Sequence, residues 1–311
     1  MVTIDPTRLA DRTVTGPRPV SVKDSRGYTV FRWVNGAALV VICFVTLYPF
    51  VNLVAQAFSS EAYINSGQVN LWPRGFNTTT FDVVTSDPMF WRNYQNTVVY
   101  TVVATVIAMA LTTTYAYAIS KRHLRGRKVF VGVAVFTMFF NGGLIPNYVL
   151  INALGMTNTI WAIVLPGAIS VFNLLVMKSF FENFPEELEE AASIDGLSTY
   201  GTFFRIVLPL SKAVVATMVL FYAVSFWNSW FSAFLYLDDR ELYPVTVYLR
   251  NLLAGASTSD SLQGGGGSDL TQVSSNVKAV TMLLTVLPII TLYPFIQKYF
   301  VSGVMLGSVK Q

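Results

Sequence analysis

Six apolar stretches, each close to the length needed to cross a bilayer, dominate the pattern of hydrophobic and polar residues along the chain. A membrane-spanning helix needs roughly 20 consecutive, mainly apolar residues. None of the six stretches contains an Asp, Glu, Lys, Arg or His residue. We therefore predict an all-α polytopic membrane protein with six transmembrane helices. The predicted spans are Trp33–Phe58, Asn96–Ile119, Val129–Leu144, Thr159–Met177, Ala213–Leu237 and Ala279–Ile296.

The third and fourth predicted spans contain residues that interrupt helices. Asn141-Gly142-Gly143 comes shortly before Pro146, so we expect the third helix to end or break there. Pro166-Gly167 interrupts the fourth span, while Pro49 and Pro288 lie inside the first and the sixth. Two interpretations stay open: ordinary kinks at proline, or broken backbone that lines a water-filled cavity inside the protein.

The distribution of basic residues predicts the orientation, because Lys and Arg concentrate on the cytoplasmic side of a membrane protein. Of the 21 basic residues, 16 lie before the first span, in the segment 121–128, between the fourth and fifth spans or after the sixth span. We therefore expect both termini to be cytoplasmic. The other five basic residues are Arg74, Arg92, Arg240, Arg250 and Lys278. The expected organisation is an N-terminal tail of residues 1–30, a transmembrane domain 31–301 with outer loops 59–95 and 238–277 and an inner loop 182–212, and a C-terminal tail 302–311.

The amino-acid composition argues against several classes of protein. Hydrophobic residues make up 53% of the chain and charged residues 12%, against about 25% charged in a soluble domain. A disordered chain is excluded and a soluble enzyme is disfavoured. The net charge of +4 follows from membrane topology, so no nucleic-acid surface is indicated. The single cysteine, Cys43, excludes a disulfide framework within the chain, and its apolar neighbours predict a small buried side chain.

The chain contains none of the sequence motifs that carry common catalytic chemistry. A phosphate-binding loop, a nucleophile elbow and a zinc-binding helix are all missing, and the one histidine, His123, lies in a basic segment. We therefore predict no catalytic residue, no metal site and no cofactor bound by this chain. Spans without charge also argue against a proton-driven carrier, and less strongly against sodium coupling.

Uncharged polar residues inside the spans suit the passage of a hydroxyl-rich solute, although hydrogen bonds between helices would use the same residues. The candidate residues of a translocation path are Asn141, Gly142, Asn173 and Asn228.

The segment FPEELEEAASIDGLSTYGTFFRIVLPL, which begins at Phe184, predicts two short helices joined at Asp195-Gly196. Pro185 suits the first helical position and Gly196 a left-handed helix end. Ser198 can cap a second helix, which is expected to end before Pro209. The segment could lie on the membrane surface, but its many glutamates oppose that, because the cytoplasmic leaflet is negative. A protein partner is the favoured interpretation.

The same segment resembles the EAA loop of ABC-importer permeases. Glu190-Ala191-Ala192, followed after two residues by Asp195-Gly196, matches the core of that motif. The family commonly has a proline where this chain has Ala213, which predicts a weaker kink at the entry to the fifth span. The resemblance implies that the following residues couple the chain to an ATPase: Glu190, Ala191, Ala192, Asp195, Gly196, Phe203, Ile206, Leu208 and Pro209.

The similarity extends over about Pro146–Leu253 and is closest to sugar-importer permeases of the maltose-transporter type. Within them, residues 141–146 and 298–305 resemble a branch that handles complex oligosaccharides or polysaccharide breakdown products. The resemblance implies a subunit of the bacterial inner membrane that forms half of a pore. Its implied partners are a second, different permease, two ATPase subunits that hold ATP and Mg, and an extracellular solute-binding protein that delivers the sugar. A permease for another kind of solute, an ion-coupled secondary carrier and a membrane scaffold remain as alternatives.

The outer segment Gly255–Asp269 is rich in Gly and Ser. Its composition is typical of an unconstrained linker. The resemblance implies a second role, because in the maltose-type system an outer loop in this place reaches into the binding protein. The candidate contact residues are Gly264, Gly265, Gly266 and Gly267.

Overall fold

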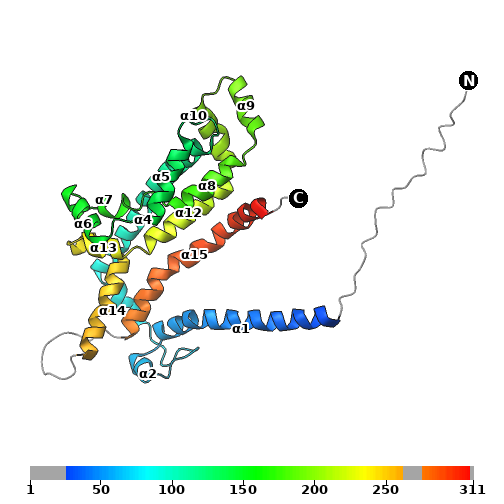
Figure 1. Ribbon diagram of the computed structural model, residues 1–311. Helices are drawn as coiled ribbons and strands as arrows, with labels where there is room; N and C mark the ends of the chain where they lie inside the picture. The colour runs from blue at the N-terminus through cyan, green and yellow to red at the C-terminus, as the bar shows by residue number, and fades with distance from the viewer. Residues whose placement is uncertain (1–25, 262–274, 309–311) are drawn as a thin grey trace, which may run out of the picture. The chain divides into compact units, whose positions relative to one another are not determined.

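The structure is a computed structural model that describes residues 26–261 and 275–308, and every regular element in these residues is helical (Figure 1). Contacts divide the chain into two units, residues 1–51 and 52–311. The described part of the first unit belongs to α1 (Arg26–Ala57), which contains Pro49 without interruption. Cys43 is exposed on α1, so the prediction that it is buried was wrong. A small apolar side chain can face lipid as readily as a protein core, because lipid tails are themselves apolar.

Three helices are each long and apolar enough to cross a membrane: α1, α4 (Pro88–Ser120) and the part Ser275–Leu292 of α15 (Ser275–Ser308). Two bent pairs raise the number to five if each pair is one span. One pair is α5 (Arg127–Phe139) with α6 (Leu144–Ala153), bent by 115°, and the other is the segment Thr199–Leu210 with α12 (Lys212–Trp227), bent by 83°. The described residues therefore form an all-α protein with three to five candidate spans.

The predicted span Thr159–Met177 is not one continuous helix. It consists of α7 (Trp161–Val164) and the first part of α8 (Val171–Glu182), separated by residues 165–170 around Pro166-Gly167. The side chain of Ser170 caps α8 by accepting a hydrogen bond from the backbone N–H of Asn173, and its own N–H donates to the Tyr222 hydroxyl at 2.9 Å. The helix is therefore broken here, and one backbone N–H of the break, that of Ser170, is bonded to the Tyr222 hydroxyl.

The third predicted span also breaks, but earlier than Pro146. Helix α5 ends at Phe139, and α6 begins at Leu144 after Gly143, which has a φ of +95°. The Asn141 side chain stabilises this turn, because its Oδ1 accepts a hydrogen bond from the Gly143 N–H at 3.0 Å. Pro146 lies in the first turn of α6, where a backbone N–H has no helical partner and is not needed.

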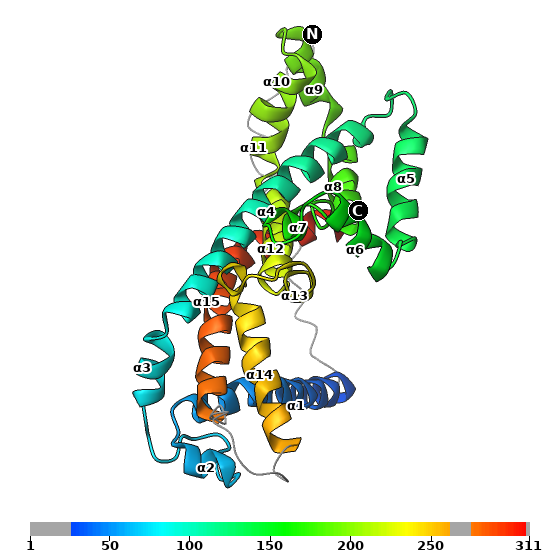
Figure 2. The same cartoon turned by 90° about the vertical axis from the view of Figure 1, so that its left-hand side faces the viewer.

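Helix α4 is the centre of the second unit, and Figures 1 and 2 show it alongside α8 and α12. Ala108 and Ala116 on α4 are completely buried and allow close approach of the neighbouring helices. Leu174 and Met177 of α8 are buried in the same cluster. A hydrogen bond of 2.6 Å joins the hydroxyls of Thr112 and Tyr222 and links α4 to α12. Helix α15 packs on the other side of α12.

The two predicted outer loops carry short helices and are held against the start of α4. The Val245 N–H donates to Thr97 Oγ1 at 2.7 Å, and Asn96 Nδ2 donates to the Glu241 carbonyl at 2.6 Å. The helices of these loops are α2 (Glu61–Asn65), α3 (Thr79–Thr85), the 3-10 turn η3 (Arg240–Leu242) and α14 (Val245–Ser261), and α13 (Phe231–Tyr236) lies just before the second loop.

Asp87 joins the start of α4 to α14 through both oxygens of its carboxylate. Its Oδ1 accepts the Met89 N–H at 2.8 Å as the helix cap, and its Oδ2 accepts the Tyr248 hydroxyl at 2.7 Å. Burial, and secondarily this hydrogen bond, raise the pKa of Tyr248. The tyrosine therefore remains a neutral donor throughout the physiological pH range.

We expect Asp87→Ala to lower the thermal unfolding midpoint of the purified protein in detergent, with a loss of about 1 kcal/mol for the cap. Tyr248→Phe removes only the link to α14 and should cost about 1 kcal/mol or less. Tryptophan fluorescence measures the midpoint. Asp82→Ala is the matched control, because Asp82 is exposed on α3. Equal midpoints for Asp87→Ala and Asp82→Ala would contradict the assignment.

Candidate functional site

The loop 182–212 folds into the two short helices that its sequence predicts. Helix α9 (Glu186–Ile194) follows Pro185, which lies at the cap position just before the helix. The left-handed residue that ends the first helix is Gly196, with a φ of +79°. The side chain of Ser198 caps α10 (Thr199–Thr202) by accepting the Gly201 N–H at 3.2 Å.

The helical segment after α10 runs further than expected. It continues through a π-helical turn, η2 (Phe203–Val207), into α11 (Leu208–Leu210), so it does not end before Pro209. Pro209 lies at the start of α11, a position where the missing N–H is tolerated.

The chain turns by 83° at the entry to α12, even though the family's proline is replaced by Ala213. The turn lies at Ser211, two residues before Ala213, and so does not depend on a proline at that position. Ser211 is completely buried, and its Oγ donates to the Val207 carbonyl at 2.6 Å. This hydrogen bond ties the two sides of the bend together.

Ion pairs and aromatic rings fix the loop to the ends of the neighbouring helices. Lys121 Nζ, just after α4, pairs with the carboxylate of Glu189 on α9. The same ammonium lies 4.3 Å from the centre of the Tyr117 ring, which in turn packs on buried Phe203 with ring centres 4.8 Å apart. Phe181 completes this aromatic cluster.

A second ionic contact lies at the end of α8. Glu182 pairs with Arg127 at the start of α5 and with Lys178 at 2.8 Å on its own helix. Partial burial, and secondarily the positive charge of Arg127, lower the pKa of Lys178. Sequence reasoning missed the pairs Lys121–Glu189 and Arg127–Glu182, since nothing in the local pattern shows that residues 68 and 55 positions apart come together.

The two alanines of the motif have different environments. Ala192 is buried, with 2% of its surface exposed, whereas Ala191 is exposed. Glu190, Asp195 and Gly196 are exposed as well, and Phe203 is buried beneath them. The remaining predicted residues are Ile206 and Leu208, which are half-buried, and Pro209, which is exposed.

Two large side chains at the tip of the loop are exposed and were not predicted as functional. Ile194 ends α9 with 87% of its surface exposed, and Tyr200 on α10 has 78% exposed. A signal for Ile194 was present in the sequence, because it is the apolar residue directly before the Asp195-Gly196 turn. The tip therefore presents apolar surface beside the small side chain of Ala191.

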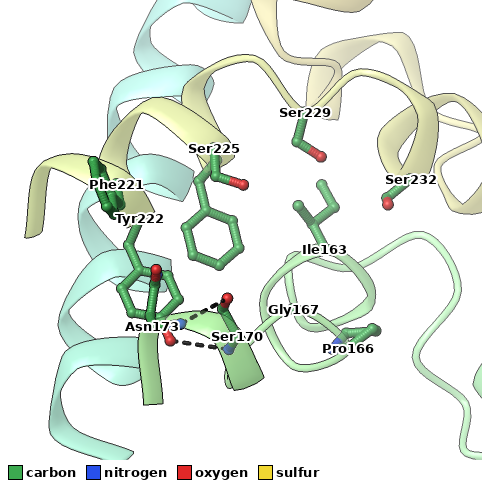
Figure 3. Close-up of a pocket in the computed structure, with 11 residues that line it drawn as sticks. Ile163, Pro166, Gly167, Ser170, Asn173, Phe221, Tyr222, Ser225, Ser229 and Ser232 are labelled. Atoms are coloured by element: carbon green, nitrogen blue, oxygen red, sulfur yellow. Dashed lines mark hydrogen bonds between the residues drawn. The ribbon is translucent and has the colours of Figure 1, made fainter. Parts of the chain in front are cut away.

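A polar cavity of about 500 Å³ lies between the break before α8, the end of α12 and the segment 229–232 (Figure 3). Pro166 and Gly167 form part of its wall, which agrees with the interpretation of broken backbone lining a cavity. Asn173, one of the residues predicted for a translocation path, lines this cavity together with four serines and three aromatic side chains. These are Ser170, Ser225, Ser229 and Ser232, and Phe221, Tyr222 and Phe226.

The other predicted residues of a translocation path lie elsewhere. Asn141 and Gly142 line a second cavity of about 510 Å³ beside the break between α5 and α6, and Pro166 belongs to the walls of both cavities. Asn228 lines neither of these cavities, and its side-chain amide donates to the Val224 carbonyl at 2.9 Å. The predicted contact residues Gly264–Gly267 lie outside the described residues.

Comparison with known proteins identifies the family. A family model described as "Binding-protein-dependent transport system inner membrane component" matches residues 125–305. Protein LplC of Bacillus subtilis (strain 168) is 39% identical over 266 residues, covering 86% of this chain and 90% of that protein. The polygalacturonan/rhamnogalacturonan transport system permease protein YtcP of the same strain is 37% identical over 272 residues, covering 88% and 95%.

A solved structure shares the fold as well. The crystal structure of a bacterial ABC transporter involved in the import of the acidic polysaccharide alginate contains a chain that matches with a TM-score of 0.80 and 31% identity. The match covers 90% of this chain and all of that one. The chain therefore belongs to the family of inner-membrane components of binding-protein-dependent transport systems, as a multi-pass permease and not an enzyme.

Proposed function

We propose that the chain forms one half of the pore of an ABC importer that carries oligosaccharides across the bacterial inner membrane. Family membership supports import that depends on a binding protein. The names of its relatives support the solute class, because one transports polygalacturonan or rhamnogalacturonan and another takes part in alginate import. A second, different permease completes the pore, two ATPase subunits supply the energy, and an extracellular solute-binding protein delivers the sugar.

In this proposal the chain crosses the membrane six times, with both termini in the cytoplasm. The spans are α1, α4, α5, α7 with α8, α12 with α13, and α15. The basic segment after α4 and the loop 182–212 then lie on one side, in agreement with the excess of Lys and Arg there. The helices α2, α3 and α14 face the opposite side, where the binding protein docks.

The proposed contact with the ATPase is the exposed tip of the loop 182–212. The observation that carries this assignment is the apolar surface of Ile194 and Tyr200, presented beside Ala191 on a loop that ion pairs fix to the transmembrane helices. An apolar patch that is exposed outside the membrane-spanning segments favours a protein partner. A loop that is anchored at Lys121 and Arg127 passes on a displacement of its tip instead of absorbing it.

The proposal as a whole is tested by copurification. The chain, expressed with its neighbouring genes, should purify with a second permease and an ATPase. ATP hydrolysis by that complex in liposomes should rise several-fold when the loaded binding protein is added. Transport without any ATPase would instead indicate a secondary carrier, and the absence of solute flux would indicate a scaffold.

Ala191→Trp should abolish uptake and the stimulated ATP hydrolysis, because the indole would hold the ATPase away from the α9 backbone. Ala191 is preferred to Ala192, since a bulky side chain at the buried Ala192 would disrupt the loop itself. Ala153→Trp, at an exposed position of α6, controls for the added bulk. Normal copurification and normal uptake by Ala191→Trp would show that the tip is not the docking surface.

The ion pair between Lys121 and Glu189 gives a second test of coupling. Lys121→Glu and Glu189→Lys should each reduce uptake per ATP hydrolysed, because each places two like charges side by side between α4 and α9. The double variant restores opposite charges and should recover most of the loss. If the double variant is as defective as the sum of the single ones, the pair has no role in coupling.

A further inference from the structure

The side chains of the polar cavity have unused capacity for hydrogen bonds. Several serine and threonine hydroxyls in the helices donate to the carbonyl one turn before them, as Thr113, Thr217 and Thr285 do, whereas those of Thr101 and Thr105 have no partner in the described part of the chain. Ser225, Ser229 and Ser232 make no such side-chain bond within the described residues, and Figure 3 shows all three around the cavity. Their hydroxyls are therefore available to a molecule inside it.

Asn173 is the most telling of these groups. Only 6% of its surface is exposed, and its side-chain amide makes no hydrogen bond to the other residues that the structure describes, so the accessible part of this amide opens onto the cavity. An amide that faces a cavity and has no protein partner can pair with water or with the polar groups of a bound molecule. Asn173 lines the cavity, so a molecule bound there can supply the missing donor and acceptor.

The aromatic wall of the cavity gives a second indication. Phe226 and Tyr222 lie on the same face of α12 with their rings stacked, 6.2 Å between centres. Gly167 lies directly against Phe226, and a Cβ at this position would come within 3.2 Å of the ring. Sugar rings bind in this way, with their C–H faces on aromatic rings and their hydroxyls on amides and hydroxyls.

The absence of charge in the cavity lining indicates which class of sugar the cavity can bind. None of the residues that line the cavity, all of which the structure describes, carries a charge. Arg250 lies on α14, with its guanidinium 3.8 Å from the centre of the Phe234 ring, and is not part of the lining. A carboxylate held at membrane depth without a cation is strongly unfavourable. The cavity therefore favours an uncharged sugar unit over a uronate.

We propose that the polar cavity is a sugar subsite of this chain that accepts an uncharged pyranosyl or furanosyl unit, with Asn173 as the residue that recognises its hydroxyls. This inference rests on the proposed function. It assigns direct contact with the solute to this permease, and for acidic oligosaccharides it places their neutral units here. Carboxylates are then held by other parts of the pathway.

The test uses the complete transporter in liposomes, with both permeases, the ATPases and the binding protein. Uptake and ATP hydrolysis are measured together for three probes: arabinotriose, trigalacturonate and a rhamnogalacturonan tetrasaccharide. Asn173→Leu should raise the KM about tenfold for probes that contain a neutral unit, because one hydrogen bond is lost. The amount of sugar moved per ATP hydrolysed should fall as well. A folding defect would instead lower the rate of uptake and the rate of ATP hydrolysis together.

Two further variants keep the test decisive. Ser225→Ala combined with Ser229→Ala removes two hydroxyls with little change in volume and should raise the KM in the same direction. Asn152→Leu makes the same exchange at an exposed position of α6 that lines neither cavity, and should leave the KM as it is.

The possible outcomes distinguish a failure of the proposed subsite from a failure of the proposed function. A wild-type KM in both Asn173→Leu and the double serine variant overturns the subsite and leaves the importer intact. An equal loss for trigalacturonate and for the neutral probe overturns its preference for uncharged units. If the wild-type complex moves none of the probes and its ATP hydrolysis does not respond to the binding protein, the proposed function itself fails.

Discussion

The constraint on which this structure depends is that a backbone N–H or carbonyl group inside a bilayer has no water to bond with. Helices satisfy the constraint automatically, so each place where a helix breaks needs a substitute partner. The break before α8 obtains it from the Tyr222 hydroxyl, and the break before α6 from the side chain of Asn141. Both breaks lie in the walls of cavities. The cavities are thus a direct consequence of where the helices are interrupted.

Helix α4 connects the two ends of the molecule. At its start, Asp87 and Thr97 hold α14 through hydrogen bonds. At its other end, Tyr117 and Lys121 hold the loop 182–212. Between these ends, small residues such as Ala108 let α8 and α12 approach closely. A single helix therefore contacts α14 at its start, α8 and α12 along its middle, and the loop 182–212 at its end.

Local rules predicted the local features of the fold well. The left-handed Gly196 and the cap at Ser198 were foreseen, because each depends on a few neighbouring residues. Features that depend on tertiary contacts with distant parts of the chain were not foreseen. The pair of Lys121 with Glu189 needs the tertiary fold, and the bend at Ser211 forms without the proline that a family pattern would suggest. Cys43 showed that an apolar run does not reveal whether a side chain faces protein or lipid.

The near right angle at Ser211 has a mechanical consequence. The segment Thr199–Leu210 is set at 83° to α12, so in the proposed importer it would act as a lever arm on this helix. A lateral force on a collinear extension of α12 would only tilt this helix, whereas the same force on a perpendicular segment applies a torque about the α12 axis. Because Tyr222, Ser225 and Phe226 lie on one face of α12 and line the polar cavity, rotation of this helix would move all three relative to the rest of the cavity wall.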